Sequence, residues 1–294
     1  MARTPRPLAG PARGPTRLRA TRAVVSAGAL HTTFARLGVR PGGVLVAQAS
    51  LGSLGFVLHG IESLRSALER VLGDGTLVVP TFTGDATDPS SWVDPALPAS
   101  LWNEVRDGMP GFDRERSLPR QMGLLALSVL MDRRSVRSDH PLCSFAAVGP
   151  RAEELVADHS LRDPLGPESP IGRARAAGGQ VLLIGLDQRK NVALAHAHSC
   201  SDVAQVARRR GAFLHVEDGE RRWITPDRLV ECGDGYGRIE DYLAVRGHVR
   251  CDRVGDATVR LMELEPSCSA AEHHIRLRPE AVFCGRPECR QCVR

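Results

Sequence analysis

The sequence has no long hydrophobic run. None of its apolar segments approaches the ~20 residues that a helix needs to span a bilayer, and its N-terminus lacks the apolar core of a secretory signal. We therefore expect a soluble, cytoplasmic protein that does not bind membranes. The 294 residues, of which 42% are hydrophobic, are enough to bury a substantial core as one large α/β unit with an appended C-terminal part.

Acidic residues are absent from the first 22 residues, which carry six arginines among many Pro and Gly. Removing these six charges from the total of +5 leaves −1 for the rest of the chain, so the basic excess belongs to this segment. A segment of this composition cannot bury a core, and we expect a disordered tail. Because it has no aromatic residues interleaved with its arginines, a nucleic-acid partner is not expected.

Disulfides are not expected, because the chain has eight cysteines but no secretion signal. Three cysteines form a C-x4-C-x2-C ending whose last spacing suits thiolate ligands of zinc: Cys284, Cys289 and Cys292. A fourth ligand would come from Cys232, or from His273 or His274, after folding. Three reduced surface thiols without a metal are the alternative.

The clearest structural pattern is a strand–loop–helix–strand unit near the N-terminus. Short apolar runs at Val44–Ala47 and Thr76–Val79 predict buried strands, and the apolar spacing in Ile61–Leu72 predicts a helix between them. Such a crossover is right-handed. A loop of small residues at 48–55 follows the first strand, where its backbone N–H groups could hold a phosphate or a carbonyl oxygen.

The most concentrated acid–base chemistry follows another predicted buried strand, Val181–Ile184. The chain leaves this strand through polar residues and then reaches His196 and His198. Ligands of α/β sheets bind beyond the carboxyl ends of the strands, so one of these imidazoles is a candidate base. The two histidines could equally form a hydrogen-bonded helix face, or ligate zinc.

Three further segments carry structural predictions. Residues 84–120 read as a long loop that holds aromatic residues, which is typical of a functional excursion over a cleft. Phe213–Glu217 and Arg221–Thr225 predict a hairpin around Asp218-Gly219. Asp256–Leu264 is interpreted as a helix.

Several stretches together resemble the aminoglycoside 3-N-acetyltransferase family. They run in the family's order and cover most of residues 38–191: ASLGSLGFVLHG with LGDGTLVVPTFTGDATDPSSW (49–92), LPRQMGLL (118–125), RSDHPLCSFAAVGPRAEEL (137–155), DPLGPESPIGR (163–173) and VLLIGLDQRKN (181–191).

The resemblance implies an α/β fold with a central mixed sheet flanked by helices, unrelated to the common acetyltransferase fold. The chain then divides into the tail 1–22, an acetyltransferase-like domain 23–280 and a Cys-rich tail 281–294. The resemblance also implies direct transfer of acetyl from acetyl-CoA to an amino group, and a homodimer is a further expectation. In the family the cofactor runs along the first two strand–loop junctions, which correspond here to Ser50, Leu51, Gly52, Ser53, Thr81, Phe82 and Thr83.

The family's catalytic histidine and a nearby glutamate follow its central strand. Counted without gaps, they fall on Ala195 and His198. A one-residue bulge in the loop would bring His196 into the catalytic position; otherwise His140 of the SDHP motif is the alternative base. The family orients its base with a downstream carboxylate, for which Asp227 is the nearest candidate.

The acceptor is expected to be an aminoglycoside or a related amine. A polycationic sugar requires acidic side chains in the cleft, and the candidate acceptor contacts are Asp85, Asp113, Asp139 and His198. Two other functions stay open. A degenerate member of the family would bind CoA without catalysis, as Ala195 suggests, and a zinc-dependent hydrolase would use the two central histidines.

Overall fold

The structure is a computed structural model. It describes residues 23–92, 96–203, 213–217, 220–228, 232–287 and 289, with only the backbone described at 85, 91 and 213–217. The predicted tail 1–22 and Cys292 of the predicted zinc site lie outside the described residues. None of the helices that it describes has the length and apolar character of a membrane span.

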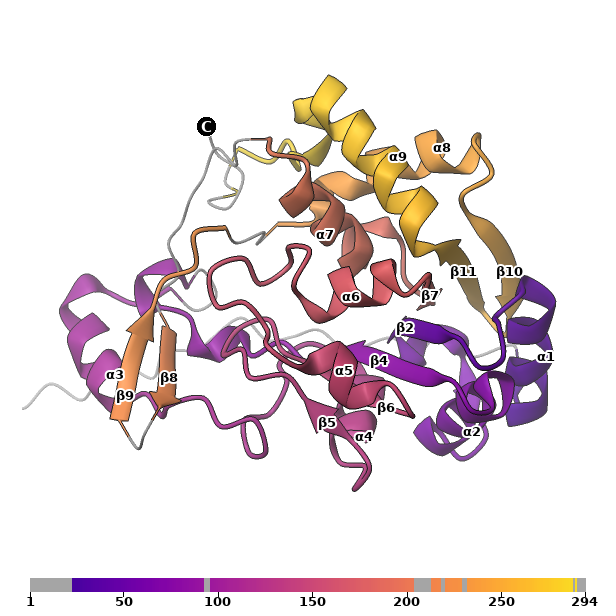
Figure 1. The fold of residues 1–294 in the computed structure, drawn as a ribbon, viewed down its shortest axis with the longest axis horizontal. Coiled ribbons are helices and arrows are strands. Elements are labelled where there is room, and N and C mark those ends of the chain that lie inside the picture. Colours follow the sequence, from indigo (N-terminus) through magenta and orange to yellow (C-terminus); the bar gives the residue numbers. More distant parts are fainter. Residues whose placement is uncertain are drawn as a thin grey trace, which may run out of the picture.

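A seven-stranded sheet forms the centre of the fold (Figure 1). Its three central strands are parallel, with β2 (Val44–Ala49) between β4 (Thr76–Pro80) and β7 (Gln180–Ile184). The sheet is mixed, as the resemblance implied, because every outer strand is antiparallel to its neighbour. These strands are β11 (Ala257–Glu263) and β10 (Arg250–Val254) beyond β7, and β6 (Phe145–Val148) and β5 (Val136–Arg137) beyond β4.

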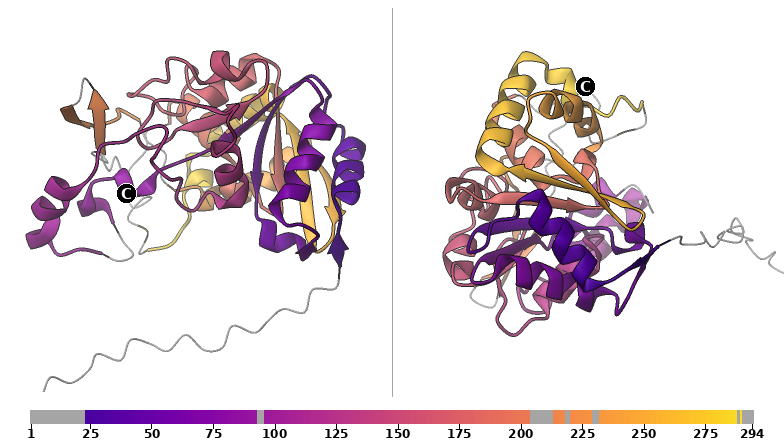
Figure 2. Two further views of the ribbon diagram at one scale, coloured as in Figure 1. Left: turned by 90° about the horizontal axis from the view of Figure 1, so that it is seen from below. Right: turned by 90° about the vertical axis from the view of Figure 1, so that its right-hand side faces the viewer.

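Helices cover both faces of this sheet (Figures 1 and 2). Side chains alternate along β2, so Leu45 and Ala47 join one apolar core and Val44 and Val46 the other. Both sets are buried, which explains why the strand is a continuous apolar run in sequence. The first face is covered by α1 (Ala27–Leu37), α2 (Ile61–Leu72) and α4 (Gly123–Leu130), and the second by α5 (Ala152–Val156), α6 (Pro170–Ala176), α7 (Val192–Cys200) and α9 (Leu264–Leu277).

The predicted strand–helix–strand unit is confirmed as β2, α2 and β4. Helix α2 begins after Gly60 and ends at Gly73, and both glycines have positive φ (55° and 53°). Leu64, Leu68 and Leu72 lie on its buried face. Burying a leucine side chain stabilises the fold by about 1.5–3 kcal/mol, so this stripe orients the helix against the sheet.

A projection beside the sheet is built from two segments that are distant in sequence (Figure 1). The predicted hairpin is confirmed as β8 (Phe213–Glu217) and β9 (Glu220–Ile224). The long connection at 84–120 contains three short 3₁₀ turns and helix α3 (Trp102–Gly108). The Arg221 guanidinium of β9 donates to the carbonyl oxygens of Asp107 (2.9 Å) and Met109 (2.7 Å), so the hairpin is fastened to α3.

The predicted helix at Asp256–Leu264 is wrong, because this segment forms β11. It pairs with β7 on one side and β10 on the other, and Gly255 (φ +57°) lies in the turn before it. Burial alternates with period two, with Val259 and Leu261 buried and Arg260 between them half-buried. So short an apolar segment fits both the helical and the strand periodicity, and its pairing with β7 makes it a strand.

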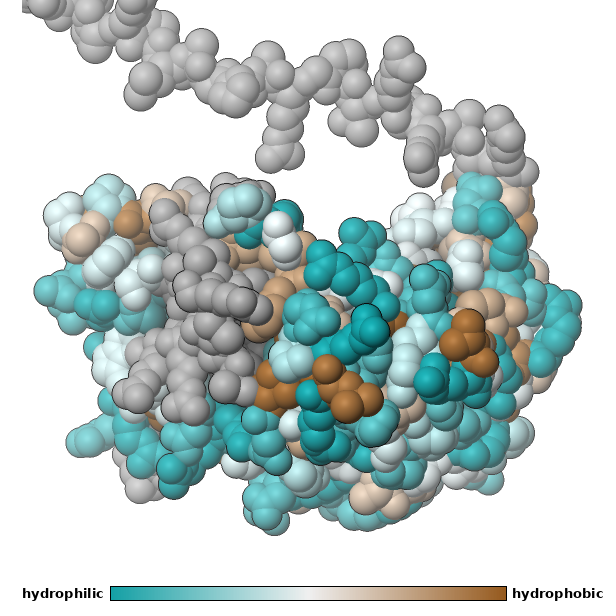
Figure 3. All heavy atoms as spheres, turned by 90° about the horizontal axis from the view of Figure 1, so that it is seen from above, coloured by the Kyte–Doolittle hydropathy of each residue, from teal (hydrophilic) through white to brown (hydrophobic). Residues whose placement is uncertain are grey.

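The described surface seen from above is mostly hydrophilic (Figure 3). Its apolar side chains form only small, separate groups, which is usual for the surfaces of soluble proteins. On this face the described side chains therefore give no broad apolar surface, and the pocket described next is the more informative feature.

Candidate active site

A pocket of about 420 Å³ lies beyond the carboxyl ends of the parallel strands. This is the place where open α/β sheets bind ligands, and the volume lies within the usual range for small-molecule sites, about 300–1,000 Å³. Its walls come from the ends of β2, β4 and β7, from the start of α4, and from the segment around η6 (Asp234–Ile239). The lining residues are Gln48, Ala49, Ser50, Phe82, Gln121, Met122, Gly123, Leu165, Leu186, Arg189, Lys190, Asn191, Val192, Ala195, Gly233 and Tyr236.

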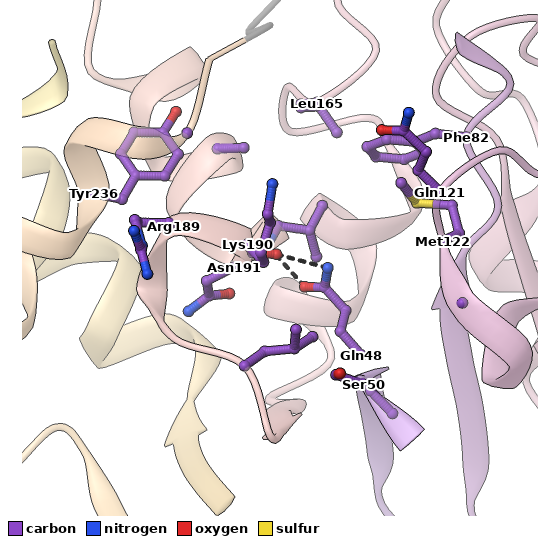
Figure 4. Close-up of a pocket in the computed structure, with 16 residues that line it drawn as sticks. Gln48, Ser50, Phe82, Gln121, Met122, Leu165, Arg189, Lys190, Asn191 and Tyr236 are labelled. Atoms are coloured by element: carbon purple, nitrogen blue, oxygen red, sulfur yellow. Dashed lines mark hydrogen bonds between the residues drawn. The ribbon is translucent and has the colours of Figure 1, made fainter. Parts of the chain in front are cut away.

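The pocket has two unlike walls (Figure 4). Phe82, Gln121 and Met122 lie on one side, and Arg189 and Tyr236 lie opposite them. Arg189 forms an ion pair with Asp187 (2.6 Å), and this guanidinium lowers the pKa of the Asp187 carboxyl. The pocket can therefore hold an extended ligand with an apolar part on one wall and a polar or anionic part near the other.

Gln48 ties the end of β2 to the start of α7. Its amide nitrogen donates to the Lys190 carbonyl oxygen (2.7 Å), and its amide oxygen accepts from the Val192 N–H (2.9 Å), as the dashed lines in Figure 4 show. Asn191 caps the same helix by accepting from the Ala193 N–H (2.9 Å). These bonds occupy the first backbone N–H groups of α7, so the start of the helix is held in place by the side chains of Gln48 and Asn191.

The small-residue loop after β2 forms another part of the pocket lining. Ser50 lines the pocket and its hydroxyl lies 2.7 Å from that of Ser53, while Leu51 and Gly52 begin the 3₁₀ helix η1 (Leu51–Leu54). Gly185, at the exit of β7, packs against this loop, since a Cβ there would lie 2.7 Å from the Ser53 Cβ. Of the four predicted cofactor residues in this loop, Ser50 is in the lining, and Leu51, Gly52 and Ser53 follow it in the chain without lining the pocket.

At the second predicted cofactor junction, only Phe82 lines the pocket. The Thr81 and Thr83 side chains are buried and bonded within the protein: the Thr81 hydroxyl lies 3.0 Å from that of Ser144, and the Thr83 hydroxyl donates to the Pro141 carbonyl. Arg137 donates to the Thr81 carbonyl (2.9 Å), and burial lowers its pKa to about 10. The threonines thus hold the strand end that presents Phe82.

His196 does not line the pocket; Ala195 does. Helix α7 continues through both residues, and which of them occupies the family's histidine position stays a prediction. The His196 ring is buried, with Nδ1 2.6 Å from the Leu165 carbonyl oxygen and Nε2 3.4 Å from the Arg175 guanidinium. Burial lowers the pKa of His196. A base role for His196 stays a prediction, which this placement does not favour.

His198 reaches the pocket through Tyr236. Its Nδ1 lies 3.0 Å from the Tyr236 hydroxyl, and Tyr236 lines the pocket. Burial lowers the pKa of His198 to about 4, so the imidazole is neutral at pH 7. In the tautomer that carries its proton on Nε2, Nδ1 accepts from the tyrosine hydroxyl. The pair therefore offers a neutral proton acceptor behind a hydroxyl group in the wall.

The other predicted catalytic residues lie away from this pair. His140 is fully buried, and its Nδ1 accepts from the backbone N–H groups of Leu142 (3.1 Å) and Cys143 (3.0 Å), which makes it the cap of a turn. Asp227 pairs with Arg162 (2.5 Å) and is exposed. Neither residue lines the pocket.

The predicted acidic contacts of the acceptor are also outside the lining. Asp113 is exposed and accepts from the backbone N–H groups of Glu115 (2.8 Å) and Arg116 (3.1 Å), so it caps a turn. Asp139 is exposed, and the side chain of Asp85 lies outside the described part. Acceptor binding by these three residues stays a prediction.

The sequence reasoning named Ser50 and Phe82 among the lining residues and missed the others, of which Lys190 and Tyr236 carry the most chemistry. Lys190 is the only lysine in the chain, a signal that a count of residue types would have revealed. Tyr236 comes from a segment 40 positions after the central histidines, and no local pattern indicates that it returns to them. The structure also brings together three of the predicted zinc ligands, Cys232, Cys284 and Cys289.

Comparison with known proteins agrees with this architecture. Aminoglycoside N(3)-acetyltransferase VIII of Streptomyces fradiae is 33% identical over 259 residues, which is 81% of this chain and 87% of that protein. Two solved structures share the fold. The YokD protein of Bacillus subtilis has a TM-score of 0.79 at 23% identity, covering 88% of this chain and 96% of YokD. AAC-IIIb in a binary complex with CoASH has a TM-score of 0.74 at 22% identity, covering 87% of this chain and 98% of AAC-IIIb.

A family sequence model described as aminoglycoside 3-N-acetyltransferase matches residues 46–276. That span contains every residue that lines the pocket and all of the parallel core except the first two residues of β2. With the sheet, the pocket position and the relatives in agreement, the chain belongs to the aminoglycoside 3-N-acetyltransferase family, whose members are acyltransferases.

Proposed function

We propose that this protein transfers an acetyl group from acetyl-CoA to an amino group of an aminoglycoside or a related amino sugar, by direct transfer in the pocket. The observation that carries the proposal is the pocket at the ends of β2, β4 and β7, with a small-residue loop and a neutral imidazole–tyrosine pair at its walls. The family membership and a same-fold protein bound to CoASH support the cosubstrate.

The wall chemistry fits a CoA thioester. The apolar side of the pocket, with Phe82 and Met122, suits the pantetheine arm, and the exposed Lys190 side chain in the lining suits a phosphate group. The first N–H groups of η1, at Leu51 and Gly52, have no carbonyl partner within that helix. They are our candidates for donors to the thioester oxygen as it becomes an oxyanion.

The acceptor amine must lose a proton as it attacks. We assign this step to Tyr236 and His198: the tyrosine oxygen takes the amine proton while its own proton passes to Nδ1 of His198. The N–C bond forms, the thioester C–S bond breaks, and the departing CoA thiolate takes up the proton that the pair has received, which restores the neutral His198 and the Tyr236 hydroxyl. General base assistance of this kind typically contributes about 10²–10⁴ in rate.

The zinc-dependent hydrolase receives no support from the central histidines. His196 faces Leu165 and Arg175, while His198 faces Tyr236, so the two rings have different neighbours. A homodimer and a cytoplasmic location stay predictions.

The test is release of thiol from acetyl-CoA in the presence of a panel of aminoglycosides and simpler amines. Tyr236→Phe and His198→Gln should each lower kcat by at least ~10² with little change in CoA binding. His196→Gln is the matched control from the same helix and should keep kcat within a few-fold. If only His196→Gln abolishes turnover, the base assignment moves to His196. If no amine causes thiol release although CoA binds, the protein is a binding member of the family without catalysis.

A further inference from the structure

Three thiols from two distant segments converge next to the pocket's η6 wall. Cys232 directly precedes η6, and Cys284 and Cys289 follow the 3₁₀ helix η7 (Pro279–Val282) near the C-terminus. Their sulfur atoms all lie within 4.8 Å of one another, and no other group of metal-binding side chains of this kind occurs in the part of the chain that the structure describes.

The spacing of these sulfurs fits a shared metal ion. The Cys232 and Cys289 sulfurs are 3.9 Å apart. A Zn–S bond of about 2.3 Å in a tetrahedral site places neighbouring sulfurs about 3.8 Å apart, whereas a disulfide bond is about 2.05 Å long. The observed distance therefore matches the edge of a zinc–thiolate tetrahedron.

Backbone packing holds the two segments together independently of the cysteines. A Cβ at Gly235 would collide with the Val282 carbonyl, so the chains touch at that point. The Arg238 guanidinium donates to the Phe283 carbonyl oxygen (2.8 Å), and Arg286 forms an ion pair with Asp234. The thiols are thus presented by a fixed scaffold.

We propose that Cys232, Cys284 and Cys289 bind a structural Zn²⁺ ion. Thiolates select soft or borderline metals, and zinc takes three or four of them in tetrahedral structural sites. Three thiolates leave one position of the tetrahedron open to water. The ion fastens the C-terminal segment to η6, and η6 carries Tyr236 of the pocket wall. Gly233, just before η6, packs closely on the Arg189 carbonyl oxygen.

The test is the zinc content of the full-length protein, purified under reducing conditions without an affinity metal and then given zinc and desalted. Wild type should hold about one zinc per chain by elemental mass spectrometry. Cys232→Ser and Cys284→Ser should each lower the content at least about fivefold. Cys251→Ser, an exposed thiol on β10, is the matched control and should keep one ion.

A second measurement covers variants that fail to fold. Titrating the metal-free wild-type protein with Co²⁺ should produce a thiolate-to-cobalt charge-transfer band that saturates at one equivalent and disappears on addition of zinc. Absence of both stoichiometric zinc and this band in the wild type would overturn the proposal, as would full zinc retention by folded Cys232→Ser. Neither readout depends on acetyl transfer, so the two proposals fail separately.

Discussion

Helix α7 shows how a change of one residue position alters the surroundings of a side chain. Successive residues are rotated by about 100° around a helix, so Ala195 faces the pocket while His196 faces Leu165 and Arg175. His198, three positions after Ala195, returns to the same side and meets Tyr236. This face of α7 therefore presents an alanine to the pocket and a histidine to Tyr236 of η6.

Lys190 carries a prediction at the residue scale. A charge-assisted bond to a phosphate is worth about 1.5–3 kcal/mol, and an exposed side chain lies at the low end. Since 1.4 kcal/mol corresponds to a tenfold change, Lys190→Met should raise the Kd for CoA about tenfold. Lys190→Arg, which keeps the charge, should stay within about threefold. Isothermal titration of each variant measures this.

The single lysine also allows a direct footprint. An amine-reactive acylating reagent can modify only Lys190 and the chain's amino terminus, and mass spectrometry separates the two. CoA should protect Lys190 and leave the terminus reactive. Unchanged CoA affinity in Lys190→Met together with equal labelling in the presence of CoA would remove Lys190 from the site.

At the scale of elements, the β10–β11 hairpin depends on one glycine. Gly255 has φ +57°, and a Cβ there would collide with the Leu54 carbonyl of η1. Gly247 has a similar positive φ of +75°, but a Cβ there meets nothing within 4 Å. An alanine at Gly247 would therefore cause backbone strain alone, whereas an alanine at Gly255 would cause backbone strain and a steric collision.

Gly255→Ala should destabilise the protein clearly more than Gly247→Ala. The strain of positive φ alone costs about 1–2 kcal/mol, and the collision adds to it only at Gly255. Urea unfolding followed by circular dichroism gives both free energies. Equal losses would show that the hairpin does not pack on η1 as described, and a gain from Gly255→Ala would favour the helix that the sequence predicted for the following segment.

The elements that were predicted well are those with one dominant local signal. Helix α2 has apolar residues at helical spacing between two glycines, and β2, β4 and β7 are short apolar runs next to breaks. The segment at 257–263 was predicted wrongly because its pairing partner, β7, lies more than 70 residues earlier in the sequence. Local periodicity cannot report such a pairing.

At the scale of the whole molecule, the pocket collects residues between Gln48 and Tyr236. The sequence indicated that the site lies at the ends of the buried strands, because ligands of α/β sheets bind beyond the carboxyl ends of the strands. It did not find the Tyr236–His198 pair, because the bond joins a helix to a distant 3₁₀ segment. The structure brings Cys232 close to Cys284 and Cys289, as one of the alternatives from the sequence had it, while zinc binding by these thiols stays a prediction.

Three of the buried imidazoles, those of His159, His196 and His198, give the whole molecule a pH dependence. Burial lowers the pKa of His159 and His198 to about 4, and that of His196 in the same direction. His159 lies between Ser138 (2.9 Å) and the Pro164 carbonyl oxygen (2.8 Å) and close to the His140 ring; Arg173 lowers its pKa further and Asp139 opposes this. At neutral pH, burial therefore favours the neutral form of each ring in the folded protein.

The sign of the pH effect follows from linkage. The unfolded chain has histidine pKa values near 6.5, so between about pH 6.5 and pH 4 it binds more protons than the folded chain. Stability is then fully present above pH 6.5 and falls as the pH drops, by up to about 1.4 kcal/mol per pH unit for each imidazole. Urea unfolding at pH 7, 6 and 5 should show this decline, in a range where carboxylate titration contributes little.

His198→Gln removes one titrating ring and should reduce the slope of stability against pH over this range, whatever its effect on stability at pH 7. His273→Gln, on the exposed face of α9, is the matched control and should leave the slope unchanged. The free energy of unfolding of the wild type should not be flat between pH 7 and pH 5. A flat profile would mean that these imidazoles titrate alike in the folded and unfolded chain, and His198 would then be too solvated to serve as the neutral acceptor behind Tyr236.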